Sequence, residues 1–203
     1  MPDDSPLRPS PLAMTALLVL AGGPMHPYEM QRRIKQWGKD LVVNVGQRAN
    51  LYKTVERLNR AGLIAIRQTE RDHRFPERTV YELTDDGLRV GLEWLTDMLA
   101  TPRNEFPRFP AALSFLMVLP PPKVLAALVA RSEGLRERLA ELDRELTVEP
   151  GLPRLYLLET EYLRTVTEAE LGWVEGVAEE LRSGALSWTR EQIAETARAF
   201  PLE

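Results

Sequence analysis

The sequence predicts a mainly α-helical protein with two domains, and three observations lead to this prediction. In the first half, the predicted elements run in the order helix, helix, helix, strand, charged loop, strand, helix. Charge is divided between the halves: residues 24–83 hold twelve lysines or arginines against seven acidic residues, whereas residues 101–203 hold twelve against seventeen. In the second half, leucines recur at alternating spacings of three and four residues, which is typical of helices packed along a seam. A basic region joined to an acidic one indicates a polyanion-binding part attached to a part with another task.

Composition narrows the classes of function. The chain has 203 residues, a formal net charge of −4, no cysteine and two histidines. Disulfides and thiolate metal sites are therefore excluded, and two histidines are a poor basis for a zinc site, so we expect no metal and no cofactor. The sequence has no glycine-rich phosphate loop, nucleophile elbow or His-Glu-x-x-His motif, so we expect no enzyme.

The N-terminal region does not resemble a membrane or secretion signal. It begins MPDDSPLRPSP, which is acidic and proline-rich rather than basic. The apolar run at residues 12–21 is ten residues long, too short to cross a bilayer. We expect a cytoplasmic protein with no membrane partner.

Two helices should open the first domain, residues 10–100. Ser10 before Pro11 is typical of a helix start, with a hydroxyl N-cap and then proline at the first helical position. The apolar helix that follows should be buried and end at residues 22–24. A second helix is predicted over residues 27–38, and residues 41–45 should form a short extended segment.

The third predicted helix, residues 47–61, has an apolar side and a basic side. Lys53 and Arg60 lie nearly opposite the apolar stripe, which consists of Leu51, Val55 and Leu58. Gly62 then fits a left-handed helix cap.

A β-hairpin and a further helix follow. Residues 64–70 and 79–84 alternate partly with period two and are rich in β-branched residues, and the segment between them is charged and turn-like. Thr84 should cap the next helix, whose stripe consists of Leu88, Leu92, Leu95 and Leu99.

Three helices closed by a short hairpin predict a winged helix-turn-helix, in which the third helix enters the major groove and the wing follows the DNA backbone. His26 should donate or accept a hydrogen bond at the entry of the second helix rather than act as a catalytic base. The alternative for the basic helix is an ordinary solvated face; its position before a basic hairpin favours DNA. The predicted DNA-binding residues are Tyr28, Gln47, Arg48, Asn50, Tyr52, Lys53, Arg57, Arg74 and Arg78.

The second half should be an α-helical dimerisation domain, residues 111–203, reached through a proline-rich linker at residues 101–110. A longer helix after residue 151 carries a second apolar stripe, in which Tyr162 and Trp173 should be core. Thr189 and Gln192 are spaced as a capping box for a last short helix. The predicted dimer seam consists of Leu128, Leu135, Leu139, Leu142 and Leu146.

Three segments make the sequence resemble the PadR family of bacterial transcriptional regulators. They are LVLAGGPMHPYEM at residues 18–30, LYKTVERLNRAGLI at residues 51–64 and ERTVYELTDDGL at residues 77–88. Pro27 stands where the family usually has glycine and Lys53 where it usually has proline, so we do not expect the family's sequence preference to carry over.

The resemblance implies a function. It predicts a homodimeric, sequence-specific DNA-binding regulator that reads an inverted-repeat operator and acts as a repressor released by a small effector, often an aromatic one. Trp94 and Met98 share one flank of the helix after the wing, where they either pack against another domain or subunit or line an effector pocket. The alternative function is a winged-helix module for protein–protein contacts without DNA binding.

Overall fold

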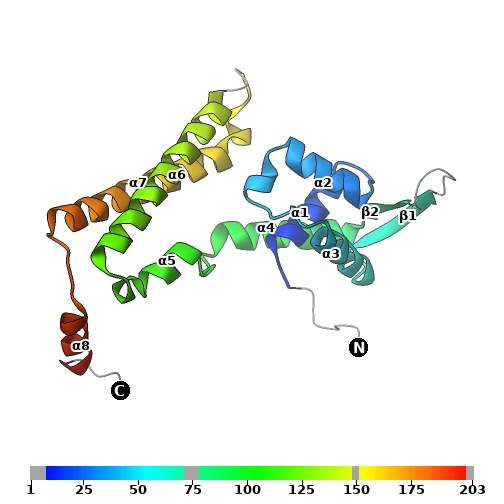
Figure 1. Cartoon of the computed structure of the whole chain (residues 1–203). Coiled ribbons are helices and arrows are strands. Elements are labelled where there is room, and N and C mark those ends of the chain that lie inside the picture. The colour runs from blue at the N-terminus through cyan, green and yellow to red at the C-terminus, as the bar shows by residue number, and fades with distance from the viewer. Residues whose placement is uncertain (1–7, 71–77, 148–150, 200–203) are drawn as a thin grey trace. The chain divides into compact units, whose positions relative to one another are not determined.

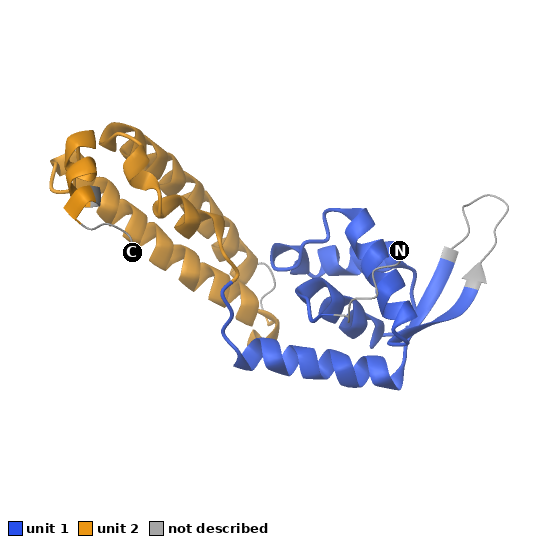
Figure 2. Cartoon of the chain, turned by 90° about the horizontal axis from the view of Figure 1, so that it is seen from below, with its two compact units in different colours: residues 1–104 blue, residues 105–203 orange. Residues whose placement is uncertain are grey.

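The computed structural model describes residues 8–70, 78–147 and 151–199. The chain divides into two compact units, residues 1–104 and residues 105–203, which Figure 2 shows in blue and orange. Unit 1 combines helices with a two-stranded antiparallel sheet, and unit 2 is helical. The predicted fold class is confirmed.

Three helices pack around one apolar core at the start of unit 1 (Figure 1). They are α1 (Pro11–Leu20), α2 (Pro27–Gln36) and α3 (Arg48–Arg60). The predicted cap of α1 is confirmed, because the Ser10 hydroxyl accepts a hydrogen bond from the backbone N–H of Ala13 at 3.2 Å. The fully buried side chains come from all three helices and include Leu17, Met30, Ile34, Leu51 and Leu58.

The segment between α2 and α3 differs from the prediction. Where an extended segment was expected, the 3-10 turn η1 (Lys39–Leu41) occupies its beginning. Gly38 precedes it with a φ of 67°, a left-handed conformation that glycine adopts without steric cost and that reverses the chain directly after α2. The apolar pattern had detected burial rather than a strand, since Val43 and Val45 are buried in the core.

The predicted hairpin is confirmed as β1 (Ile64–Glu70) and β2 (Arg78–Leu83), with a bulge between Ile66 and Gln68. Met25, just before α2, pairs with Tyr81 of β2 through two backbone hydrogen bonds of 3.0 and 3.1 Å. The hairpin is thereby attached to the start of α2. Most of the predicted basic tip, residues 71–77, lies outside the described residues.

The helix after the wing, α4 (Asp85–Ala100), turns a different face to the core than expected. Gly87 and Gly91 are its buried residues, and Gly91 lies against Leu17 and Leu18 of α1. The predicted stripe is mostly exposed, with Leu92 at 49 % and Leu99 at 81 % of its surface accessible. Small residues let α4 approach α1 closely, so the leucine spacing identified the helix but not its inner face.

Unit 2 begins earlier than the predicted linker allows. Its first helix, α5 (Arg108–Leu113), has Pro107 as N-cap and Pro110 in its first turn. Proline is tolerated in the first helical turn because the N–H that it lacks would have no partner there. Proline content alone therefore led to the wrong assignment of residues 108–110 as linker.

Two long helices, α6 (Pro121–Thr147) and α7 (Leu158–Ser183), lie side by side and form the body of unit 2 (Figure 1). Their shared core contains Val124 and Leu128 from α6 and Val174, Ala178 and Leu181 from α7. Short 3-10 turns precede each helix, η2 (Leu116–Val118) and η3 (Arg154–Tyr156).

The predicted dimer seam is already covered within the chain. Leu128 is 4 % and Leu142 0 % exposed, and Leu135 packs against the core shared with α7. Leu139 and Leu146 are half-buried. The seam is a helix–helix contact within the chain, because the following helix folds back onto it. Its role between subunits stays a prediction.

The expectation that Tyr162 and Trp173 are core residues is also wrong. Tyr162 is 68 % and Trp173 48 % exposed. A helix can carry apolar residues on more than one face. In α7 the buried face contains Thr160, Val174, Ala178 and Leu181. The apolar stripe identified from sequence mostly faces outward.

The last helix, α8 (Arg190–Ala199), confirms its predicted start. The backbone N–H of Thr189 donates to Gln192 Oε1 at 2.8 Å, and the N–H of Gln192 donates to the Thr189 hydroxyl at 3.2 Å. These two reciprocal bonds are a capping box. Trp188, just before it, donates from its indole N–H to the Leu119 carbonyl at 3.0 Å, which ties this end of the chain to the start of α6.

Candidate nucleic-acid interface

Helix α3 is held at both ends by interactions that determine where its exposed face lies. Before it, Gln31 of α2 is 6 % exposed and donates from its side chain to the Val45 carbonyl at 2.6 Å. After it, the N–H of Leu63 bonds to the Leu58 carbonyl and that of Gly62 to the Asn59 carbonyl, both at 3.0 Å. This pair of bonds, with Gly62 at a φ of 72°, is a Schellman motif and confirms the predicted cap.

The wing exit is fastened to the same end of α3. The Thr84 hydroxyl accepts from the N–H of Gly87 at 3.0 Å and lies 2.9 Å from the carbonyls of Gly62 and Leu63, to which it can donate. A single side chain thus caps α4 and holds the turn between α3 and the wing.

The predicted DNA-contacting residues of this helix share its exposed side. Leu51, Val55 and Leu58 are buried against the core, as predicted. The side chains on the outside are those of Gln47, Arg48, Asn50, Tyr52, Lys53 and Arg57. Gln47 and Asn50 also bond to each other, since the Asn50 amide donates to Gln47 Oε1 at 3.0 Å.

Charge on this helix is not neutralised locally. Among the described residues, no acidic side chain forms an ion pair with Lys53, Arg57 or Arg60. Other basic side chains are paired: Glu29 forms an ion pair with Arg33 on α2 at 3.0 Å. In unit 2, arginines 131, 136, 138, 154, 164 and 182 each lie within ion-pair distance of a carboxylate. The basic side of α3 is therefore available to a polyanion.

Two contacts connect the start of α2 to this face. The His26 and Tyr52 rings meet edge to face, with centroids 6.1 Å apart at an interplanar angle of 73°. The Arg48 guanidinium carbon lies 5.6 Å from the centroid of the Tyr28 ring. Tyr28 is 52 % and Tyr52 37 % exposed, so both phenols remain accessible. Sequence reasoning had selected Tyr28, Arg48 and Tyr52 but not their contacts.

His26 has the role expected of it at the helix entry. It is the N-cap of α2, and its Nδ1 accepts a hydrogen bond from the backbone N–H of Tyr28 at 3.0 Å. An imidazole nitrogen that accepts a hydrogen bond carries no proton, so the proton of the neutral ring is on Nε2.

The wing contributes less to the described interface. Arg74 lies outside the described residues, and of Arg78 only the backbone in β2 is described. On the described part, Arg67 pairs with Glu82 at 3.6 Å across the two strands. Burial, and secondarily the charge of Glu56 on α3, raise the pKa of the Tyr81 phenol, which keeps it neutral where the wing meets α3.

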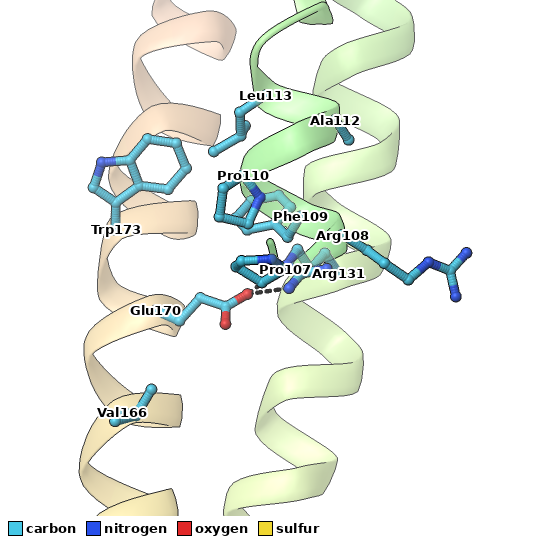
Figure 3. Close-up of a pocket in the computed structure, with 10 residues that line it drawn as sticks. All are labelled: Pro107, Arg108, Phe109, Pro110, Ala112, Leu113, Arg131, Val166, Glu170 and Trp173. Atoms are coloured by element: carbon cyan, nitrogen blue, oxygen red, sulfur yellow. Dashed lines mark hydrogen bonds and ion pairs between the residues drawn. The ribbon is translucent and has the colours of Figure 1, made fainter. Parts of the chain in front are cut away.

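A second feature lies in unit 2. An open groove of about 880 Å³ is lined by α5, α6 and α7, and Figure 3 shows its ten residues. Its inner side holds an ion pair between Arg131 and Glu170, with Arg131 Nε 2.6 Å from Glu170 Oε1. The Arg131 guanidinium carbon lies 3.6 Å from the centroid of the Phe109 ring, and Phe109 meets Trp173 edge to face at 6.0 Å. The rest of the lining is Pro107, Arg108, Pro110, Ala112, Leu113 and Val166.

The residues predicted to form an effector pocket belong to unit 1. Trp94 packs against the core of that unit, and Met98 is half-buried one turn later on α4. The groove of unit 2 contains neither of them. In the sequence, the groove was indicated only by the apolar stripe of α7, and that stripe had been predicted to lie in the core.

Within the described ranges, no group of three or more histidine, aspartate or glutamate side chains is placed to hold a metal ion. No helix in those ranges is long and apolar enough to cross a membrane.

Comparison with known proteins identifies the first unit. Residues 16–91 match the model of the transcriptional regulator PadR-like family. This span runs from α1, through α2, α3 and the wing, into the first half of α4. The N-terminal unit is a PadR-like domain. No curated protein matches the sequence.

Solved structures share the fold of the PadR-like domain and of the helices that follow it. Bacillus subtilis PadR in complex with operator DNA matches with a TM-score of 0.66 at 18 % identity, covering 84 % of this chain and 98 % of that one. The same protein in complex with p-coumaric acid matches with a TM-score of 0.65 at 17 % identity and the same coverage. The Vibrio cholerae virulence activator AphA matches with a TM-score of 0.60 at 18 % identity, covering 85 % and 98 %.

Proposed function

We propose that this protein is a sequence-specific DNA-binding transcriptional regulator that acts as a repressor until a small effector releases it. The observation that carries the proposal is the exposed face of α3, where Lys53, Arg57 and Arg60 have no ion-pair partner among the described residues. A helix in the major groove lies between two rows of phosphates. Lysine and arginine side chains that contact these phosphates release counterions condensed on the DNA, and this release increases the binding affinity.

The PadR-like domain and the fold shared with Bacillus subtilis PadR support this proposal. The structure of that protein has been determined in complex with operator DNA. In the protein described here, the same winged fold would present α3 to DNA. The expected division of labour is that phosphate contacts position the domain and Arg48, Asn50 and Lys53 read base edges.

Recovery of bound fragments tests the proposal and its alternative together. Purified full-length protein should retain a small set of fragments from the source genome, and footprints on them should share an inverted repeat. A winged-helix module used only for protein contacts would retain none above background. Enrichment of fragments without a shared sequence would contradict sequence-specific regulation.

We further propose that the protein acts as a homodimer through the outer face of α7 in place of the leucine seam of α6. Tyr162, Val166 and Ala169 are exposed and follow spacings of four and three residues. This is the spacing of a helix that packs along a partner helix. Two-fold dimers are the commonest oligomers, and a two-fold axis would match an inverted-repeat operator.

The proposed effector is a small aromatic acid bound in the groove of unit 2. Trp173 and Phe109 offer ring faces and edges for stacking, and Arg131 offers guanidinium donors beyond those that contact Glu170. Because Bacillus subtilis PadR, which shares the fold, has been solved in complex with p-coumaric acid, that compound is a suitable probe. The originally predicted site, at Trp94 and Met98, remains the competing proposal.

The two candidate sites can be separated by matched tryptophan variants. If the groove binds the effector, Trp173→Phe should reduce release of DNA by added p-coumaric acid, whereas Trp94→Phe should not. Both variants should bind DNA as the wild-type protein does. Loss of release only in Trp94→Phe would move the site to α4, and no release of the wild-type protein would exclude this compound.

A further inference from the structure

His26 is an unusual choice for the cap of α2. Serine, threonine, aspartate and asparagine are the preferred N-cap residues, because a short side chain brings an oxygen to the free N–H groups of the first turn. Here the acceptor is His26 Nδ1, 3.0 Å from the N–H of Tyr28, and Pro27 supplies the fixed backbone of the first helical position. A short polar residue could cap the helix equally well, so capping does not explain a ring at this position.

The ring makes a second contact that a short cap could not make. Its edge-to-face partner is Tyr52, on the exposed side of α3. Tyr28, whose N–H the same ring caps, lies under Arg48, one turn before Tyr52 on that helix. One imidazole therefore adjoins one exposed tyrosine directly and holds the backbone of the other.

We propose that His26 is a positioning residue that holds Tyr28 and Tyr52 in place for contact with DNA, and this inference rests on the proposed DNA-binding function. A side chain that must be ordered at the moment of binding lowers affinity, and one that is ordered beforehand does not. Two half-exposed tyrosines beside the recognition helix would otherwise have to be immobilised by the DNA itself. The neutral imidazole serves both contacts at once, since Nδ1 accepts the N–H while the ring packs against Tyr52 in an edge-to-face contact.

Substitutions at position 26 separate the cap from the ring. His26→Asn keeps a strong cap but loses the contact with Tyr52, whereas His26→Ala loses both. We expect His26→Asn to melt like the wild-type protein and to bind a recovered operator fragment roughly 2- to 12-fold more weakly, the range for one newly mobile side chain, that of Tyr52. His26→Ala should show at least this loss together with a lower melting temperature. Ser10→Ala, which removes the cap of α1, is the control: it should melt earlier and bind DNA as before.

A double-mutant cycle tests whether His26 acts through Tyr52. In a Tyr52→Ala background, the further change His26→Asn should weaken binding much less than it does in the wild-type background. Equal losses in both backgrounds would overturn the proposal, as would unchanged DNA affinity of His26→Asn. If the wild-type protein binds no DNA, the proposed function itself fails, which is a different result from normal wild-type binding with an unaffected variant.

The protonation state gives a readout that is independent of DNA. The chain has two histidines, so nitrogen chemical shifts of His26 can be assigned by comparison with His26→Asn. The proposal requires an unprotonated Nδ1 at neutral pH. A protonated Nδ1 in the free protein would contradict it.

Discussion

Among single residues, the basic side chains of α3 lack acidic partners. Six arginines in unit 2 lie within ion-pair distance of a carboxylate, for example Arg136 with Glu175 at 2.5 Å, whereas Lys53 and Arg57 have no such partner among the described residues. Exposed ion pairs contribute little to stability, so this contrast matters for binding more than for folding. It leaves the positive charge of this helix face available to an anionic partner.

Removing one of these charges should change DNA binding and leave stability unchanged. Arg57→Ala should weaken binding to all fragments alike and reduce the slope of log K against log salt by about 0.9. Lys53→Ala should in addition alter base preference, by about 1–3 kcal/mol if it contacts a base edge. Filter-binding titrations at several salt concentrations measure both. Arg182→Ala, an exposed arginine in unit 2, is the control and should change neither.

Sequence reasoning was effective for residues whose role is local. The caps at Ser10, Thr84 and Thr189 and the glycine at position 62 were all assigned correctly, because each depends on its own few neighbours. The ring contact between His26 and Tyr52 depends on how α2 and α3 pack, and no local pattern encodes it.

Among the elements, the junction of α3, the wing and α4 is the most constrained. A Cβ atom added at Gly87 would lie 1.8 Å from the Leu63 carbonyl oxygen and 2.8 Å from its carbon. Backbone on both sides cannot yield as a flexible side chain can. Glycine is therefore required where α4 crosses the turn that leaves α3.

We predict that Gly87→Ala destabilises unit 1 by at least the 1–3 kcal/mol or so that is typical of overpacking. The clash would push α4 away from the turn at Leu63 and disturb the end of α3. Thermal unfolding followed by circular dichroism measures the loss. Gly134→Ala in α6 is a matched control, because an added Cβ there meets nothing within 4 Å. It should stabilise unit 2 by about 0.5–1 kcal/mol, since alanine favours the helix.

Helix positions were predictable, but helix orientation was less so. Both α4 and α7 carry more apolar residues than one face can bury, and periodicity alone does not say which stripe faces the core. In α4 the answer depended on Gly87 and Gly91, whose lack of side chains permits close approach to the neighbouring backbone. In α7 it depended on α6 of the same chain, which covers Val174 and Ala178 and leaves Tyr162 exposed.

For the whole molecule, the proposed dimer determines how well DNA is bound. A single winged domain with a few phosphate contacts binds weakly at physiological salt. Joining two copies makes the second contact intramolecular and can raise overall binding by roughly 10²–10⁴. Two α3 helices related by a two-fold axis should read half-sites about 34 Å apart.

Charge placed on the two faces of unit 2 should have different effects. Val166→Glu, on the exposed stripe of α7, should shift the protein from dimer to monomer in sedimentation and keep its helical circular dichroism. Leu142→Asp should instead unfold unit 2, because the carboxylate would be buried without a partner where the leucine is 0 % exposed. The reverse result, a folded monomer from Leu142→Asp and an unaffected dimer of Val166→Glu, would return the dimer contact to α6.

The central claim is that the basic face of α3 binds DNA. The most direct measurement is the affinity of the wild-type protein and of a Lys53→Ala, Arg57→Ala double variant for one recovered fragment between about 50 and 200 mM salt. We predict that wild-type affinity falls steeply over this range and that the double variant binds more weakly, with a slope shallower by at least about 0.9, the value for the phosphate contact of Arg57. Wild-type affinity that does not change with salt, or a double variant with the wild-type slope and affinity, would contradict the claim.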